Sequence, residues 1–379
     1  MNFAPTKEQE LVRQMVREFA EKEVKPIAAE IDRTEEFPIE NVKKMAKYGM
    51  MGIPFPKEYG GAGGDTQAYV MAVEELSKMC AATGVILSAH TSLCASLINE
   101  YGTEEQKRKY LVPLAKGEKL GAFGLTEPNA GTDAAGQQSV AVLEGDHYVL
   151  NGSKIFITNG AKADIFVIFA MTDRSKGVKG ISGFIVEKGF PGFSIGKVED
   201  KMGIRASSTT ELIFEDCIVP AENLVGREGK GFGIAMKSLD GGRIGIAAQA
   251  LGIAEGAFEE AKNYMKERKQ FGKSLDKFQG LSWIMADMDV AIESARHLVY
   301  LAAWKKDNKL PYTVDAARAK LHAANVAMDV TTKALQLFGG YGYTKDYPVE
   351  RMMRDAKITE IYEGTSQVQR MVISGNIFR

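Results

Sequence analysis

Hydrophobic and polar positions change their spacing twice along this chain. The first part carries apolar residues at helical spacing, so that Leu11, Met15 and Phe19 fall on one face of a helix. Near residue 119 the pattern changes to the short apolar runs typical of β-strands, and near residue 230 the helical spacing returns. The pattern predicts an N-terminal α-helical domain, a middle β domain and a C-terminal α-helical bundle domain, over residues 1–118, 119–226 and 227–379.

Local signals refine the first two parts. Capping boxes predict helix starts at Thr6 and at Thr103, and the second of these helices should end near Gly117. The glycine-rich stretch 59–64 lacks both the GxGxxG order and a preceding strand, so a loop is favoured over a nucleotide-binding fingerprint. A hairpin is expected around Glu144-Gly145-Asp146. The β-rich runs are Val140–Val149, Ile165–Met171, Ile181–Glu187 and Glu211–Phe214.

The last part predicts long helices at about 240–267, 278–306 and 313–338, followed by a shorter pair. Their apolar stripes suit a four-helix bundle, and several alanine-rich faces suit contacts between subunits equally well. Self-association is therefore expected. The stripe of the second long helix consists of Leu281, Ile284, Met285, Met288 and Ile292.

Composition narrows the function classes. With 48 Lys plus Arg against 49 Asp plus Glu, the net charge is −1, so no global field attracts nucleic acid or an anionic membrane. Cys80, Cys94 and Cys217 form no CxxC pair and are interpreted as reduced thiols. The 4 His residues are scattered, which indicates no metal site. No apolar signal core and no run of 18 apolar residues is found, so a cytoplasmic protein is expected.

One carboxylate near the end of the chain is a candidate for catalysis. Gly364 should break a helix that arrives from Val349, and Ser366 with Gln369 should form a capping box for the last helix. Glu363 would then lie at a break between helices, where a side chain can enter a cleft beside free backbone N–H groups. That geometry suits a general base next to a polarised carbonyl. From this segment alone, a solvated surface glutamate is the better interpretation.

Four motifs change that balance, because together they resemble the acyl-CoA dehydrogenases in the family's own order. The similarity extends over essentially all 379 residues and is greatest to the bacterial butyryl-CoA (short-chain) dehydrogenases. It implies an α+β fold with a helical N-terminal domain, a middle β-barrel or sandwich and a C-terminal four-helix bundle. The motifs are Leu125–Asp133, Ile157–Gly160, Glu267–Gly272 and Gln336–Gly340.

The resemblance implies FAD as a tightly bound, non-covalent cofactor, because a flavin accepts a hydride and no side chain does. Leu125, Thr126 and Thr158 would surround the isoalloxazine ring, and Phe156 would stack on it where many relatives have Trp. An ordinary strand threonine is the alternative for Thr158. Further positions match family contacts to the FAD diphosphate and adenosine, partly across a subunit interface. These are Arg268, Phe271, Gln279, Gln336 and Gly340, with Thr365 and Gln367 after the base and Thr132 on the motif loop.

For the substrate, the resemblance implies Glu363 as the base that removes the α-proton. The thioester carbonyl would lie between the Glu363 N–H and a ribityl hydroxyl, and burial should raise the pKa of the carboxyl. Some relatives carry the base on the first bundle helix, but the corresponding residue here is Gly242, which cannot serve. The other substrate positions are Thr132, Asp240, Arg243, Tyr362 and Gly364.

The favoured function is FAD-dependent dehydrogenation of a short-chain acyl-CoA, butyryl-CoA to crotonyl-CoA, in either direction. The chain has no second redox motif, so electrons should pass to an electron-transferring flavoprotein. The resemblance also implies a homotetramer built as a dimer of dimers. Alternatives are a medium- or branched-chain acyl-CoA dehydrogenase, an O₂-using flavin oxidase of the same fold, and a non-catalytic scaffold. Retention of Glu363 and of the FAD positions argues against a scaffold.

Overall fold

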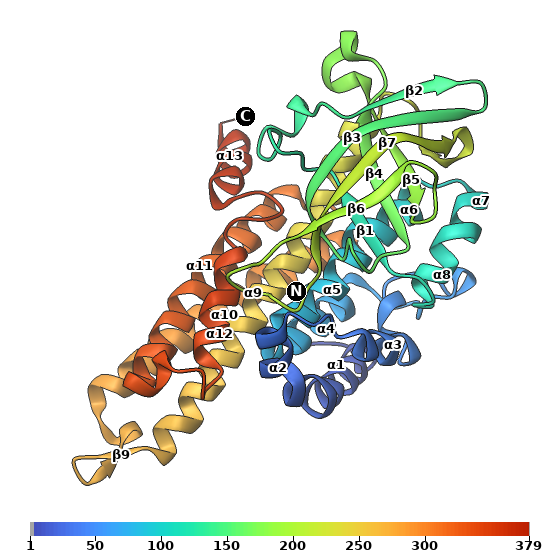
Figure 1. Cartoon of the computed structure of the whole chain (residues 1–379). Coiled ribbons are helices and arrows are strands. Elements are labelled where there is room, and N and C mark those ends of the chain that lie inside the picture. The colour runs from blue at the N-terminus through green and yellow to red at the C-terminus, as the bar shows by residue number, and fades with distance from the viewer. Residues whose placement is uncertain (1–3, 379) are drawn as a thin grey trace.

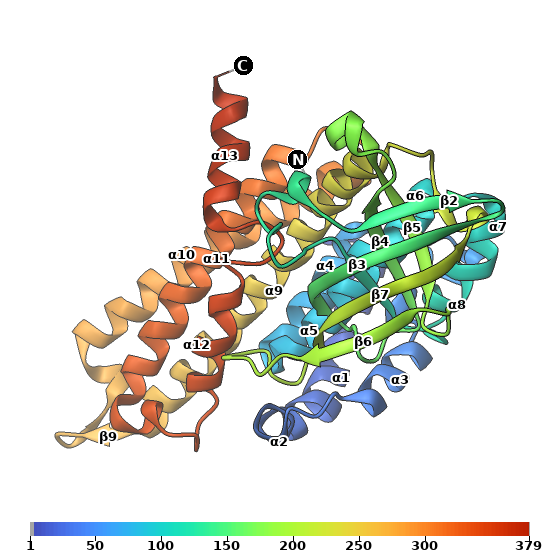
Figure 2. The ribbon, with the colours of Figure 1, turned by 45° about the horizontal axis from the view of Figure 1, so that its top comes forward.

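The computed structural model, which describes residues 4–378, has helices at both ends of the chain and a sheet between them (Figure 1). The sheet lies on one side and the last helices of the chain lie on the other. α5 (Ala81–Ser88) and the first long C-terminal helix, α9 (Gly231–Glu267), run between them (Figure 2). The predicted order of helices, sheet and helices is confirmed. The domain boundaries at residues 118 and 226 stay a prediction.

The first part is a compact set of short helices. Both predicted capping boxes are present, at Thr6 and Thr103. The expected apolar face of the first helix is wrong at one position. Leu11 is 58% exposed, because the face toward the core runs through Gln9, Val16 and Phe19. The helices are α1 Lys7–Phe19, α2 Ala28–Thr34, α3 Ile39–Lys47, α4 Thr66–Met79, α5 Ala81–Ser88, α6 Ser96–Tyr101, α7 Glu104–Gln106 and α8 Val112–Ala115.

One helical stretch, Ala81–Tyr101, combines α5, a π-helical segment and α6. By length and composition it is apolar enough to cross a membrane, but 94% of its apolar window is buried inside the protein. It forms the floor of the cavity described below and contacts both β1 (Gly121–Gly124) and the first long helix of the bundle. Its apolar character is therefore that of a core helix.

The middle part is an eight-stranded sheet in the order β6-β7-β3-β2-β4-β5-β8, with β1 paired in parallel to β4. The predicted hairpin is confirmed, since Glu144 pairs with His147 across a two-residue turn. β1, β6 and β8 were not predicted, because the first and last are short and β6 carries Gly196 and Lys197. The other strands are β2 Val140–Glu144, β3 His147–Thr158, β4 Ile165–Met171, β5 Ile181–Glu187, β6 Phe193–Val198, β7 Thr209–Pro220 and β8 Leu224–Val225.

The last part is the helical bundle. Its first helix begins at Gly231 rather than near residue 240, since Gly231 and Gly233 weaken the local signal. The predicted stripe of α10 is confirmed, with Met288 and Ile292 buried and the other members packed against the core. A small hairpin of β9 Lys269–Gln270 and β10 Lys273–Ser274 follows α9. The helices are α9 Gly231–Glu267, α10 Gln279–Asp307, α11 Thr313–Phe338, α12 Val349–Ile358 and α13 Ser366–Ile377.

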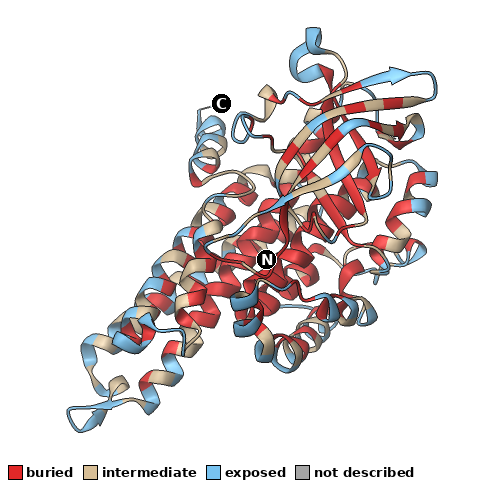
Figure 3. Cartoon of the chain, viewed as in Figure 1, coloured by how far each residue is buried: buried red, intermediate tan, exposed pale blue. Residues whose placement is uncertain are grey.

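Burial is greatest where α4, α5, α9 and α11 meet, and it falls toward the free ends of the bundle (Figure 3). Small residues on α9 allow this close packing. At Gly252, for example, an added Cβ would lie 2.3 Å from the carbonyl oxygen of Glu74. The site described next is built at the edge of this dense region, where α9 passes beneath the sheet.

Candidate active site

A cavity of about 470 Å³ lies between the sheet, the Ala81–Tyr101 helix, α9 and the connection from α12 to α13. Apolar residues such as Val85, Ala89 and Leu93 form its floor. The fold brings together many predicted site residues that are far apart in sequence. Those that line the cavity are Leu125, Thr126, Thr132, Phe156, Thr158, Arg243, Tyr362, Glu363, Gly364 and Thr365.

Glu363 lies at the expected break between helices. The preceding helix ends at Ile358, and Glu363 and Gly364 both take positive φ values, 50° and 92°. Among residues 4–378, the buried Oε2 atom of Glu363 has no hydrogen-bond partner. In the described part of the chain the Glu363 backbone N–H also has no acceptor. The turn thus places an unpartnered carboxylate and a free donor at the cavity wall.

The predicted capping box at Ser366 is wrong by one residue. Thr365 is the N-cap, and its hydroxyl accepts from the Val368 N–H at 3.3 Å. Gln369 does not reach back to the cap but donates to the carbonyl oxygens of Gly364 (2.7 Å) and Glu363 (3.3 Å). The glutamine therefore holds the turn that carries Glu363, which is a more direct role in the site than capping.

The surroundings of Glu363 suit a base. Burial raises the pKa of its carboxyl to about 8, while the nearby cations of Lys320 and Arg243 act in the opposite direction. A carboxylate with its pKa in this range is basic enough to accept a proton from an activated carbon acid near neutral pH.

Gly242 makes room for this carboxylate. A Cβ at position 242 would lie 2.0 Å from Glu363 Oε2 and 2.8 Å from Leu93 Cδ2. Any larger side chain there would displace the Glu363 carboxyl. The structure thus agrees with the expectation that position 242 cannot supply the base.

The two predicted CoA contacts on α9 are separated by the structure. Arg243 lines the cavity, and its Nε donates to the Glu363 carbonyl oxygen at 3.5 Å. Asp240 does not line it. Instead it is buried, accepts from Arg243 Nη1 at 2.8 Å and from the Thr313 hydroxyl at 2.6 Å. In this structure Asp240 orients Arg243 through the hydrogen bond from Arg243 Nη1.

The opposite wall fits a flat aromatic cofactor. A register shift in β3 between Lys154 and Ile157 turns Phe156, at φ 58°, outward so that it is 60% exposed. In the described part of the chain the hydroxyls of Thr126 and Thr158 make no hydrogen bond. An uncovered aromatic face beside free hydroxyls and apolar walls matches what a flavin ring needs.

Two charged residues that sequence reasoning missed hold this wall. Lys154, fully buried, donates to Glu127 Oε1 at 2.7 Å and to the Leu125 carbonyl oxygen at 3.2 Å. Glu127 also accepts from the backbone of Gln138 and Ser139. Burial lowers the pKa of Lys154 to about 8, and the Lys154 charge helps to hold the pKa of Glu127 below its usual value. The pair fixes the 125–139 loop onto β3.

A third missed residue is Lys320 on α11. Its side chain is fully buried, and its Nζ donates to the Gly364 carbonyl oxygen at 2.8 Å. The signal lay in the sequence around it, because Ala316, Ala319 and Ala323 form an apolar helix face on which Lys320 is the exception. A lysine on such a face cannot easily reach solvent.

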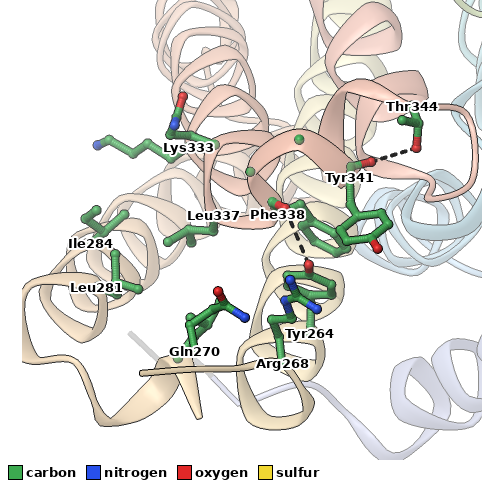
Figure 4. Close-up of a pocket in the computed structure, with 14 residues that line it drawn as sticks. Tyr264, Arg268, Gln270, Leu281, Ile284, Lys333, Leu337, Phe338, Tyr341 and Thr344 are labelled. Carbon is green, nitrogen blue, oxygen red and sulfur yellow. Dashed lines mark hydrogen bonds between the residues drawn. The ribbon is translucent and has the colours of Figure 1, made fainter. Parts of the chain in front are cut away.

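A second, more open cavity of about 640 Å³ lies between the C-terminal end of α9, α10 and the end of α11 (Figure 4). It brings together Arg268, Gln336 and Gly340 from the predicted nucleotide contacts. The Arg268 guanidinium lies 5.5 Å from the ring centre of Tyr341. Close by, Tyr264 and Phe338 stack with ring centres 4.0 Å apart.

Three predicted FAD contacts lie outside both cavities. Phe271 is 93% exposed on the β9–β10 hairpin, and Gln279 and Gln367 are exposed at the starts of α10 and α13. Gly340 lines the open cavity with free space beside it, since an added Cβ would meet nothing within 4 Å. One chain alone therefore does not assemble the whole predicted FAD set.

Comparison with known proteins gives consistent results. Models of the acyl-CoA dehydrogenase N-terminal, middle and C-terminal domains match residues 6–118, 122–217 and 229–378. The short-chain specific acyl-CoA dehydrogenase of Clostridium acetobutylicum is 83% identical over the full length of both chains. The solved butyryl-CoA dehydrogenase of Megasphaera elsdenii is 57% identical, with a TM-score of 0.99 and full coverage of both chains.

A further solved structure is that of an electron transferring flavoprotein of Acidaminococcus fermentans, described in connection with flavin-based electron bifurcation. The matching chain is 60% identical, has a TM-score of 0.99 and is covered completely, as is the present chain.

Proposed function

The chain belongs to the acyl-CoA dehydrogenase family, and we propose that Glu363 is the base with which it removes the α-proton of a short-chain acyl-CoA. The observation that carries this proposal is the buried, unpartnered Glu363 carboxylate at the wall of the 470 Å³ cavity. The reaction converts butyryl-CoA to crotonyl-CoA or runs in reverse. Four-carbon specificity is supported by the names of the similar proteins.

The residues at the turn would act together on the thioester. The free Glu363 N–H donates to the thioester carbonyl oxygen, which stabilises the charge that develops when the α-proton leaves. The Glu363 carboxylate receives that proton. Arg243 faces the same cavity and would contact the CoA moiety, while Asp240 holds Arg243 in place. Tyr362, Gly364 and Thr132 complete the proposed substrate contacts.

The family is FAD-dependent, and FAD when bound supplies the hydride acceptor that no side chain provides. Phe156 would lie against the isoalloxazine ring, and the hydroxyls of Thr126 and Thr158 would donate to its polar edge. Arg268 would pair with a phosphate in the open cavity. The remaining proposed contacts are Leu125, Thr132, Phe271, Gln279, Gln336, Gly340, Thr365 and Gln367.

The partners are a short-chain acyl-CoA, an electron-transferring flavoprotein and further copies of the chain in a homotetramer. Exposed apolar side chains on α10, such as Trp283 (62%) and Val290 (69%), fit contacts between copies. A cytoplasmic location is proposed from the bacterial relatives.

Anaerobic mixing with acyl-CoA thioesters tests the function. The purified protein should be yellow, and butyryl-CoA should bleach its flavin band faster than octanoyl-CoA does, because a chain that exceeds the cavity clashes with its floor. A protein that octanoyl-CoA bleaches faster would be a medium-chain enzyme. A reduced protein that O₂ reoxidises as fast as the electron-transferring flavoprotein does would be an oxidase.

A further inference from the structure

Lys320 is a buried lysine directly behind the candidate base. It belongs to α11, it does not line the 470 Å³ cavity, and its side chain is 0% exposed. In the described part of the chain it makes no ion pair closer than 4.0 Å. Its hydrogen bond goes to the carbonyl oxygen of Gly364 at 2.8 Å. Burial of an ammonium group is costly, so this position calls for a compensating role.

The hydrogen bonds around the turn suggest that role. The Gly364 carbonyl oxygen accepts from Lys320 and from Gln369, at 2.8 and 2.7 Å. The preceding carbonyl oxygen, of Glu363, accepts from Gln369 at 3.3 Å and from Arg243 at 3.5 Å. The Glu363 carboxylate itself has an unpartnered buried oxygen. The orientation of the Glu363 carboxylate is therefore set by the backbone of the Glu363–Gly364 turn, which Lys320, Gln369 and Arg243 hold in place.

We propose that Lys320 is a positioning residue for the reaction: it fixes the Glu363–Gly364 turn and supplies a buried positive charge that favours the ionised form of the Glu363 carboxyl. The inference rests on the proposed role of Glu363 as the base. Lys320 does not line the cavity, and it acts through the turn and through its charge.

The charged and titratable groups that face Glu363 come from several elements. Lys320 on α11 and Arg243 on α9 favour the carboxylate, while burial favours the neutral acid. The hydroxyls of Tyr69 on α4 and of Tyr362 lie near it, and both have a raised pKa, chiefly because of burial. Burial also lowers the pKa of Lys320, to about 8, against the opposing effect of Glu363 and Glu360. Removing the Lys320 charge should therefore raise the pKa of Glu363.

The alternative is a purely structural lysine that ties α11 to the start of α13. The two interpretations differ in their pH dependence. Loss of a structural tie lowers activity by the same factor at every pH. Loss of a charge that favours the carboxylate lowers activity most where the variant's base is protonated and the wild-type base is not.

The experiment measures kcat/KM for butyryl-CoA against pH in the FAD-loaded protein and in Lys320→Met and Lys320→Gln. In both neutral variants the acidic limb of the plot of kcat/KM against pH should shift to higher pH by about one unit. Below the limb, kcat/KM then falls about tenfold relative to wild type, and the deficit shrinks above it. Lys320→Arg, which keeps the charge, should leave the limb in place. Arg318→Met is the matched control, because it removes a half-exposed cation from the same helix.

FAD content and Tm are measured for every variant. A deficit that is equal at all pH values, a limb that does not move, or neutral variants that fail to fold and hold FAD would each assign Lys320 a structural role and overturn the inference. Glu363→Gln is assayed in parallel. If it stays active, the proposed base is wrong; if it is inactive while the Lys320 variants keep the wild-type limb, only this inference fails.

Discussion

The two cavities of this chain are built on different principles. The 470 Å³ cavity is surrounded by buried charge: Lys320 and the Lys154–Glu127 pair are buried residues, and Glu363 lines the wall with its Oε2 atom buried. The 640 Å³ cavity is lined mostly by half-buried and exposed groups around Arg268, and the neighbouring β9–β10 hairpin exposes Phe271 almost wholly to solvent. A site for proton transfer needs low dielectric and fixed geometry, whereas a site for a phosphate and a nucleoside needs donors and access.

The comparison has a consequence for substitutions. In the enclosed cavity a single change removes a buried charge, leaves one without its partner or moves a reacting atom, so we expect changes in stability or rate. In the open cavity solvent compensates for a lost donor, so we expect a loss in ligand affinity, with stability falling only because less ligand is bound. Four substitutions test this difference.

The largest stability effect should follow Lys154→Met, which leaves Glu127 buried without its cation. Breaking a buried pair typically costs about 3–5 kcal/mol, seen here as a lower Tm and weaker retention of FAD. Lys197→Met, which removes an exposed cation paired with Glu199, is the control and should change Tm little. Equal Tm values for the two variants would mean that the enclosed wall is not held by this pair.

Next is Gly242→Ala, whose new Cβ would occupy the space of the Glu363 carboxyl. Displacement of a catalytic group by about 1 Å can lower the rate about 10²-fold, so kcat should fall while the protein remains folded. The matched control is Gly233→Ala on the same helix, where an added Cβ meets nothing within 4 Å. A fully active Gly242→Ala variant would show that the carboxyl has another working position.

A smaller effect is expected for Arg268→Ala in the open cavity. Hydrogen bonds to charged groups contribute about 1.5–3 kcal/mol, so FAD affinity should fall roughly tenfold to a hundredfold. Tm should fall as well and recover on addition of FAD, since a ligand that binds only the native state stabilises it. Lys266→Ala, an exposed cation in the last turn of α9, serves as control. Unchanged FAD affinity would make Arg268 an ordinary surface cation.

The smallest effect concerns stability against pH. Burial raises the pKa of Glu363 from 4.5 to about 8, so between these values the native state binds more protons than the unfolded state and loses stability as pH rises. Glu363→Gln should therefore raise Tm at pH 8, by the equivalent of roughly 1–3 kcal/mol, and the gain should shrink toward pH 5. A rise in Tm that does not depend on pH would contradict the claim that the Glu363 carboxyl is buried and titrates in this range.

Sequence reasoning succeeded where the pattern reflects burial. The run Ile165–Met171 is continuous and apolar because the strand is buried along its whole length. It failed where tertiary contacts decide. Thr365 and Ser366 are both good N-cap residues, and only the packing of the turn selects the first of them. Lys320 belongs to a residue type that usually lies in solvent, and although its helix face is rich in alanine, only the packing of the surrounding helices shows that it is buried.

In the candidate site, too, some features followed from the sequence and others depended on tertiary contacts. Residues on the motif loops were brought into the enclosed cavity as expected, because the loops join elements that pack against one another. Phe271, Gln279 and Gln367 were not, and all three are exposed in the single chain. Asp240 accepts a hydrogen bond from Arg243 Nη1, which the sequence spacing did not predict, and its expected contact with the ligand stays a prediction.

The central claim is that the Glu363 carboxylate removes the substrate proton. The most direct measurement is anaerobic stopped-flow bleaching of the flavin band by butyryl-CoA, in wild type and in Glu363→Gln at equal FAD occupancy, with Glu360→Gln as the neighbouring control. The wild type and the control should bleach alike, and Glu363→Gln should bleach at least about 10²–10⁴-fold more slowly. Bleaching of Glu363→Gln at the wild-type rate would contradict the account.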